Sequence, residues 1–196
     1  MELLVDLNWE DWHQLKATGK FVLREDDFLR QLYDTENFAD RAIISAQLVS
    51  SRMLKRLLSP AKKQIFEPGF LQIETRKYED IEPFMNYNPS DKIVLVKVDV
   101  PDDQILAINA EVWDDFDIQV MDCVSKLIDA HNKMNIDQLM ESVDDIFNVN
   151  IIDLFNIDED GTTLYFIREV NLERVEFVQY MMNGNFVKID HPAKWR

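Results

Sequence analysis

Apolar residues recur along the chain at two spacings, and each spacing predicts one kind of element. Short runs in which apolar and polar residues partly alternate are typical of strands, because successive strand side chains point to opposite faces. Such runs predict strands at 2–7, 70–78, 92–100, 162–170 and 185–190. Apolar residues three and four apart are typical of helices. They predict helices at 9–18, from about 26, at 39–59, at 110–131, and from 132 or 135 to 147.

Three residues mark where these helices begin or end. Asn8 can cap the first helix, Gly19 can end it, and Pro60 ends the helix that starts at 39. The secondary structure of two segments is not decided by these patterns. Residues 104–108 are either a further strand or an edge piece, and residues 172–182 fit neither period clearly.

The order of these elements predicts the fold class. Strand, helices, strands, helices, strands is typical of an α+β protein, here with a mixed or antiparallel sheet packed with several helices. A length of 196 residues favours one domain over 1–196. The apolar content of 46%, with twelve Phe, is enough for a packed core and distinguishes the chain from disordered acidic proteins.

Cysteine usage and hydropathy indicate the compartment. Cys123 is the only cysteine and lies among apolar residues at helical spacing, so we expect it to be buried and no disulfide to form. The first residues lack the basic region of a signal peptide, and no apolar run is long enough to cross a membrane. We therefore expect a cytoplasmic protein that does not insert into membranes.

Charge is distributed very unevenly. The acidic part, about 99–160, holds 17 Asp and Glu against two Lys, a net charge of −15 out of −16 for the whole chain. The basic helical part, about 39–63, has six Arg and Lys from position 41 onward and no acid after that position. Like charges gathered on one surface add into a field that acts on charged partners over distance.

The acidic part supplies the first set of candidate binding residues. We expect its carboxylates, including those at 137 and 153, to lie mostly exposed on one contiguous face, apart from the basic helix. Solubility alone is the alternative interpretation, and a magnesium site among the acids stays open. The candidates are Asp102, Asp103, Glu111, Asp114, Asp115, Asp117, Asp122, Asp129, Glu141, Asp144 and Asp145.

The basic part supplies a second set, which we call the basic stripe. Arg52, Lys55 and Arg56 lie at i, i+3 and i+4, so one outer side of the helix carries all three. The stripe could meet phosphates, or it could complement the acidic part within one molecule or between two copies in a homodimer. Aromatic residues for base stacking are lacking, so direct nucleic-acid binding is not favoured. The stripe consists of Arg41, Arg52, Lys55, Arg56, Lys62 and Lys63.

Catalytic and cofactor signatures are lacking in the sequence. His13, His131 and His191 have no second ligand at a metal-site spacing, and the four glycines are scattered singly rather than grouped in a phosphate loop. We therefore predict no resident metal or cofactor, and no catalytic residue.

Four short stretches carry a resemblance. They are Trp12-x-x-Leu15-x-x-x-Gly19, then VLVKVDVPDDQILAINAEVWDDF at 94–116, VDDIFNVN at 143–150 and NLERVEFV at 171–178. Together they resemble an uncharacterised bacterial family of domains of unknown function, about as long as this chain. The resemblance covers nearly the full chain and implies a common fold rather than an activity.

The same layout more loosely resembles small ADP-ribosyltransferase-like domains. Those enzymes place a His or Arg on the first strand to hold the dinucleotide and a Glu on a late strand. Here the first strand offers Val5 and Asp6, and the late acid would be Glu169 or Glu176. The resemblance implies an altered site, since Asp6 would repel an anionic cofactor. An ADP-ribosyltransferase-like or nucleotide-binding enzyme is thus the alternative function.

The charge layout favours a non-catalytic protein that acts through its acidic part. Carboxylates along helices can imitate the phosphates of a duplex and occupy the groove of a basic, nucleic-acid-binding partner. Small acidic inhibitors from phages and mobile elements, among them anti-CRISPR proteins and others that block nucleases, give a class-level analogy. We expect the chain to inhibit or sequester such a partner.

Overall fold

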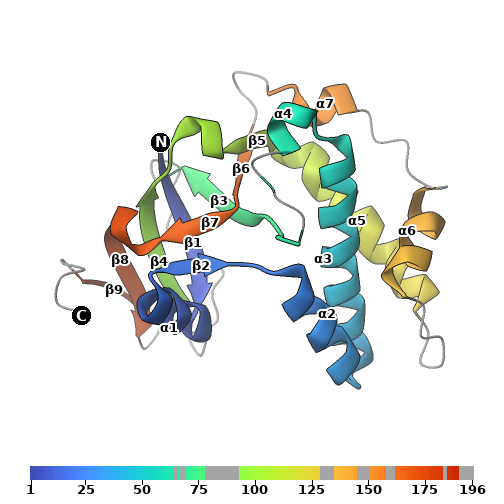
Figure 1. The fold of residues 1–196 in the computed structure, drawn as a ribbon, viewed down its shortest axis with the longest axis horizontal. Helices are drawn as coiled ribbons and strands as arrows, with labels where there is room; N and C mark the ends of the chain where they lie inside the picture. Colours follow the sequence, from blue (N-terminus) through green and yellow to red (C-terminus); the bar gives the residue numbers. More distant parts are fainter. Residues whose placement is uncertain are drawn as a thin grey trace. The chain divides into compact units, whose positions relative to one another are not determined.

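The chain forms two compact units, each assembled from segments distant in the sequence (Figure 1). The computed structural model describes residues 1–63, 66, 69–77, 93–128, 135–144, 151–157, 162–182 and 185–189. The sheet unit comprises Met1–Leu23, Ile73–Leu106 and Leu164–Arg196, and the helical unit comprises Arg24–Gln72 and Ala107–Thr163. The α+β class is confirmed. The expectation of a single domain over 1–196 stays a prediction.

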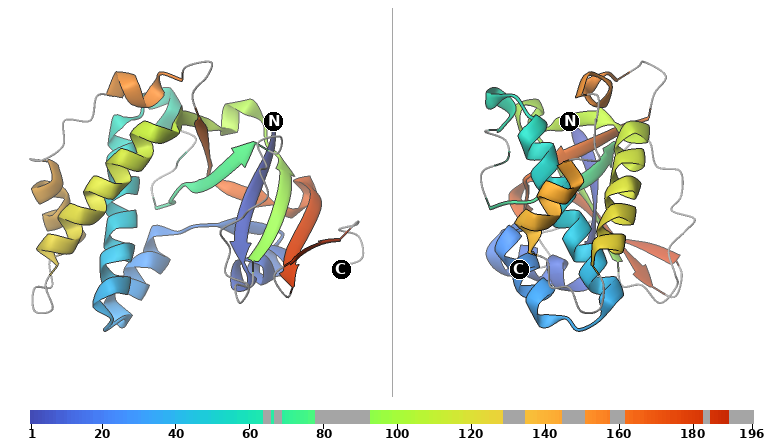
Figure 2. Two further views of the ribbon diagram at one scale, coloured as in Figure 1. Left: turned by 180° about the vertical axis from the view of Figure 1, so that it is seen from behind. Right: turned by 90° about the vertical axis from the view of Figure 1, so that its right-hand side faces the viewer.

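The sheet unit contains six neighbouring, antiparallel strands of a sheet that has seven strands among the described residues, seen from two sides in Figure 2. These six follow the order β6-β3-β1-β4-β8-β9, and the chain passes into the helical unit within the seventh strand, β5 (Leu106–Asn109). The six strands are β1 (Glu2–Asn8), β3 (Ile73–Lys77), β4 (Ile93–Asp99), β6 (Thr163–Ile167), β8 (Val175–Met182) and β9 (Asn185–Ile189).

The position of β1 follows from its sequence. Leu3, Leu4, Val5 and Leu7 are all buried, so both faces of this strand are covered. A nearly continuous apolar run of this kind is typical of an interior strand. Asp6 is the exposed residue between these buried ones.

Local capping explains the segment that follows β1. The side chain of Asn8 accepts a hydrogen bond from the backbone N–H of Asp11 (2.9 Å) at the start of α1 (Trp9–Thr18). Gly19 ends α1 in the left-handed conformation (φ 78°), as expected from the sequence. The chain then forms β2 (Lys20–Val22), which pairs with β7 (Glu169–Asn171) in a second, two-stranded sheet.

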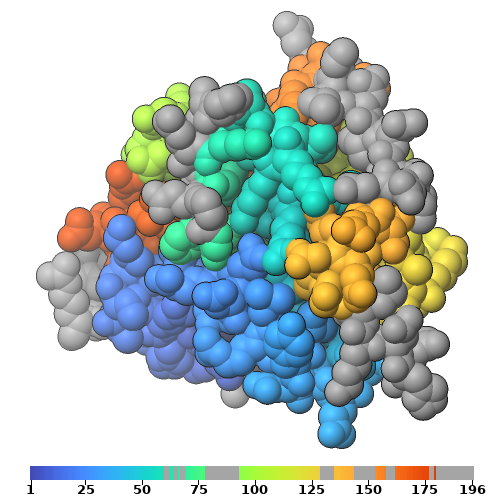
Figure 3. Space-filling view, turned by 45° about the vertical axis from the view of Figure 1, so that its right-hand side comes forward, coloured from blue at the N-terminus to red at the C-terminus, as the bar shows by residue number. Residues whose placement is uncertain are grey.

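The helical unit is organised around the long helix α3, which packs against α2, α5 and α6. In Figure 3, α6 (amber) lies beside α3 (blue to teal). Nine of the twenty residues of α3 are buried, including Ser45, Ser50 and Ser51. The helices are α2 (Glu25–Asp34), α3 (Phe38–Leu57), α4 (Pro60–Lys63), α5 (Ala110–Leu127), α6 (Ile136–Asp144) and α7 (Ile151–Phe155).

Several predicted boundaries are wrong in detail. The strand predicted at 162–170 is divided at Arg168 into β6 and β7. Residues 172–182 form a 3-10 turn followed by β8. Pro60 does not only stop α3; it also opens α4, because proline suits a first helical position. The short elements β2 and α7 were not predicted, since such short segments show no clear period.

Two further expectations concern single features. Cys123 is buried on α5, as the helical spacing predicts. Among the described helices, none is both long enough and apolar enough to span a bilayer.

Candidate functional site

The solvent face of α5 carries a group of exposed acids in the helical unit. Glu111, Asp114, Asp115 and Asp122 are all exposed. Residues three and four apart share one side of a helix, so these four carboxylates form one surface, which we call the α5 acidic face. The opposite side of α5 is apolar and buried, with Trp113, Phe116, Val120, Cys123 and Val124. Burial of that side fixes which acids point to solvent.

The carboxylates of α5 differ in how far other groups in the protein compensate them. Asp117 is half-buried and accepts a hydrogen bond from the Ser50 hydroxyl (2.7 Å). Asp122 pairs with Lys126 at 2.5 Å, and both side chains are largely exposed. Within the described ranges, no basic side chain forms an ion pair with Glu111, Asp114 or Asp115. The α5 acidic face therefore keeps most of its charge.

Ile118 lies in the middle of this face. It is four residues after Asp114, three after Asp115 and four before Asp122, and it is 65% exposed. A large aliphatic side chain surrounded by exposed acids resembles the centre of a protein interface, where apolar contacts are ringed by polar groups. Ile118 was not predicted from the sequence, although its helical spacing from the acids was the available signal.

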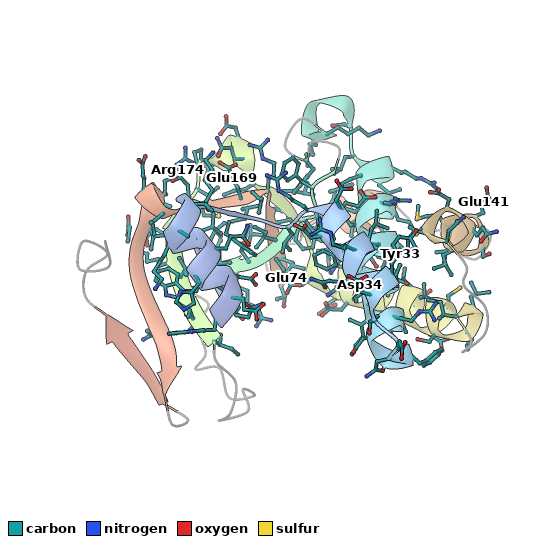
Figure 4. The ribbon with its side chains drawn as sticks, turned by 60° about the horizontal axis from the view of Figure 1, so that its bottom comes forward. Tyr33, Asp34, Glu74, Glu141, Glu169 and Arg174 are labelled. Atoms are coloured by element: carbon teal, nitrogen blue, oxygen red, sulfur yellow. The ribbon has the colours of Figure 1, made fainter. Side chains whose placement is uncertain are left out.

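The other predicted acids are distributed over several elements. Glu141 is exposed on α6 (Figure 4), and Asp144 is the last residue of that helix. Asp129 and Asp145 lie outside the described residues. Asp102 and Asp103 belong to the sheet unit, where both are exposed in a 3-10 turn. The amino group of Met1 lies 3.5 Å from the Asp102 carboxylate. The acids of α5 therefore share one surface, and a face that also includes the other acids stays a prediction.

The expectation that the basic stripe lies apart from the acids is wrong at Arg52. Its guanidinium pairs with Glu25 of α2 and, at 2.7 Å, with Asp137 of α6. Lys55 also lies 4.0 Å from Glu25. The three helices pack so closely that the charges on α3 meet acids of both neighbours. We call Glu25, Arg52, Lys55 and Asp137 the α3 ion-pair network.

Burial gives the α3 ion-pair network a different electrostatic character from the α5 acidic face. The side chains of Glu25, Arg52 and Lys55 are 16%, 26% and 19% exposed. Burial lowers the pKa of Lys55, Glu25 acts in the opposite sense, and Arg52 lowers it further. Arg52 and Lys55 are thus oriented toward α2 rather than presented to a phosphate.

The remaining members of the stripe do not form one row either. Arg41 is half-buried and Arg56 is exposed on α3, while Lys62 and Lys63 are exposed on α4. Lys62 lies over the ring of Phe155 (4.8 Å to the centroid). Of the two interpretations that the sequence left open, complementation within the molecule holds for Arg52.

The sheet unit contains a cavity of about 240 Å³. Its charged lining comes from β1, α1 and β3, and its apolar lining includes Phe21 of β2. Burial raises the pKa of Asp11, the backbone N–H of Asn8 lowers it, and Glu10 raises it. Asp6 was a candidate from the sequence, but the other lining residues were not, because separate elements of the chain bring them together. The lining consists of Leu4, Asp6, Asp11, Phe21, Leu23, Ile73, Glu74, Thr75 and Arg76.

The two late acids considered for ADP-ribosyl transfer are engaged elsewhere. Glu169 pairs with Lys20 (3.1 Å) and with Arg168 (3.5 Å), and Glu176 pairs with Lys97 (2.9 Å). Neither acid lines the cavity next to Asp6. The arrangement expected of that enzyme class, a first-strand residue and a late Glu in one pocket, is not found in this cavity.

In the described part of the chain, no three His, Cys, Asp or Glu side chains are grouped so that they could hold a metal ion. His13 stacks edge-on against Trp9, with ring centroids 5.2 Å apart. In comparisons with known proteins, no family model, curated protein or solved structure matches this chain.

Proposed function

We propose that this chain is a non-catalytic interaction protein that binds a basic protein partner through the α5 acidic face. The observation that carries the proposal is the contrast within one helix. Glu111, Asp114, Asp115 and Asp122 are exposed on one side, while the opposite side is anchored in the apolar core of the helical unit. A rigid helix holds these charges in a fixed pattern, so little conformational entropy is lost on binding.

Electrostatics supports a basic partner. A cluster of largely uncompensated carboxylates attracts a positively charged surface before contact and raises the association rate. Ile118, exposed at the centre of these charges, supplies the apolar contact that charge alone does not give. A merely soluble protein would need the acids but not the exposed isoleucine among them.

The partner class proposed is a nucleic-acid-binding protein, such as a nuclease. The groove of such a protein is basic because it must bind phosphates. Carboxylates along α5 would occupy that groove and exclude the nucleic acid, which inhibits or sequesters the partner. This is the mode of the small acidic inhibitors carried by phages and mobile elements, used here as an analogy of class only.

The test is capture of partners from a native host extract, followed by measurement of affinity for each purified partner. The triple variant Asp114→Asn, Asp115→Asn, Asp122→Asn should weaken binding about tenfold, because each exposed charge contributes up to about 1 kcal/mol. Binding of the wild type should also weaken steeply with salt. Competition with duplex DNA then tests whether the partner's nucleic-acid groove is the surface occupied.

The matched control removes the same number of charges from another part of the helical unit. Asp26 and Asp34 of α2, together with Glu36, are exposed acids that do not belong to α5 (Figure 4 labels Asp34). Changing them to Asn, Asn and Gln should leave affinity within about twofold of the wild type. Equal losses in both triple variants would show that net charge, and not the α5 acidic face, drives binding.

A further inference from the structure

The cavity of the sheet unit shares no residue with the α5 acidic face, and its lining combines apolar and charged residues. Leu4, Phe21, Leu23 and Ile73 are the apolar residues of the lining. Asp6, Asp11, Glu74 and Arg76 are its charged residues. A pocket with apolar walls and a few convergent polar groups is the usual form of a small-molecule site.

The charged lining of the cavity is anionic on balance. It contains three acidic residues and one arginine, which gives a formal charge of −2. Asp6 and Glu74 lie on neighbouring strands, and Arg76 of β3 pairs in register with Leu4 of β1. An anionic ligand would be repelled here, whereas a cation would be attracted by all three acids.

The surroundings of Asp11 also favour a cationic ligand. This carboxylate is partly buried at the start of α1, and the loss of hydration raises its pKa. A bound ammonium or guanidinium group would replace part of the water that the carboxylate has lost. We propose that the cavity is a binding site for a small organic cation, a primary amine or a guanidinium on a short apolar body.

Volume and lining restrict the ligand further. Sites for drug-sized molecules usually enclose about 300 to 1,000 Å³, so a cavity of 240 Å³ takes a smaller molecule. The apolar wall favours a ligand with a carbon body over a bare metal ion. The cationic group would lie among Asp6, Asp11 and Glu74, and the carbon body against Phe21 and Leu23.

The experiment uses the full chain and benzylamine as the probe, with benzyl alcohol as its neutral counterpart and benzoate as its anionic one. Titrations followed by amide chemical shifts should give a Kd of about 1 mM for benzylamine, as expected for so small a ligand. The largest shifts should fall on β1, the start of α1 and β3. Benzyl alcohol and benzoate should bind at least about fivefold more weakly.

Two variants test the charged lining of the cavity directly. Asp11→Asn keeps an oxygen that can accept the Asn8 N–H, and Glu74→Gln changes an exposed side chain, labelled in Figure 4. Each should weaken benzylamine binding about fivefold or more, because a hydrogen bond to a charged group is lost. Asp26→Asn, which removes an acid outside the cavity, should leave binding unchanged.

Specific results would overturn the proposal. They are benzylamine binding no tighter than benzyl alcohol, shifts confined to other parts of the chain, or wild-type binding by both cavity variants. Asp6→Asn provides a third variant should either of the first two fail to fold. The α5 triple variant should bind benzylamine normally, so loss of partner binding and loss of cation binding are separate outcomes.

Discussion

The α5 acidic face and the α3 ion-pair network contain the same kind of charged group in opposite situations. On α5, Glu111, Asp114 and Asp115 are exposed and no described basic side chain pairs with them. In the network, Glu25 is 16% exposed and is held by Arg52 and Lys55. Both groups belong to one helical unit, so helix packing and not composition decides the role of each acid.

The difference teaches which charges stabilise the fold and which are available to a partner. A carboxylate that has lost water needs a nearby cation, and removing that cation leaves an uncompensated charge. An exposed carboxylate contributes little to stability but acts on molecules in solution. We therefore expect mutations in the two groups to affect different measurements.

The largest effect is expected from Arg52→Met. The guanidinium joins α3 to Glu25 of α2 and Asp137 of α6, and its loss leaves the partly buried Glu25 with Lys55, at 4.0 Å, as its ion-pair partner among the described residues. We expect a loss of about 2 kcal/mol in the free energy of unfolding, less than for a fully buried pair because the site is partly exposed. Urea denaturation measures it.

Arg30→Met is the control for that change. Arg30 pairs with Asp27 at 3.3 Å, but the two side chains are 71% and 46% exposed. Its loss should cost less than about 0.5 kcal/mol. An equal loss in the free energy of unfolding for the two substitutions would contradict the distinction between the network and the exposed charges.

The second effect belongs to the α5 acidic face. The triple variant at Asp114, Asp115 and Asp122 should lose about tenfold in partner affinity while its free energy of unfolding changes by less than about 0.5 kcal/mol. A loss of stability similar to that of Arg52→Met would show that these acids support the fold. Calorimetric binding and urea denaturation of the same samples decide between the two.

The third effect concerns Ile118, which is 65% exposed between the acids. Ile118→Ser should weaken partner binding about fivefold, mainly through faster dissociation, because an apolar contact at the centre of an interface is lost. The salt dependence of binding should stay as in the wild type. Ile157→Ser, at another exposed isoleucine (38%), is the control and should bind normally.

The smallest effect is a pH dependence at Asp11. Its pKa is raised above the ordinary value of 3.8, chiefly by burial, so ionisation of this carboxyl opposes folding near neutrality. Asp11→Asn should therefore be slightly more stable than the wild type at about pH 7, and the difference should disappear by about pH 3. There the carboxyl is protonated in both folded and unfolded chains. Urea denaturation at several pH values measures the trend, and a difference that grows as the pH falls would contradict it.

Much of the local structure could be predicted from the sequence. Asn8 and Gly19 bound α1 as expected, and the apolar spacing of α5 correctly gave Cys123 a buried position. Capping and periodicity act over a few residues, so the sequence carries them directly. The α+β class followed from the order of the elements.

The candidate sites depended on contacts between distant residues. The sequence predicted exposed acids along α5, but it could not show that Arg52 reaches Asp137, 85 positions away. Nor could it bring Asp11 of α1 and Glu74 of β3 to one cavity. Spacing determines which side of a helix or strand a residue occupies. Only the packing of α2, α3 and α6, and of α1 against β1, decided which charges are compensated and which stay open to a ligand.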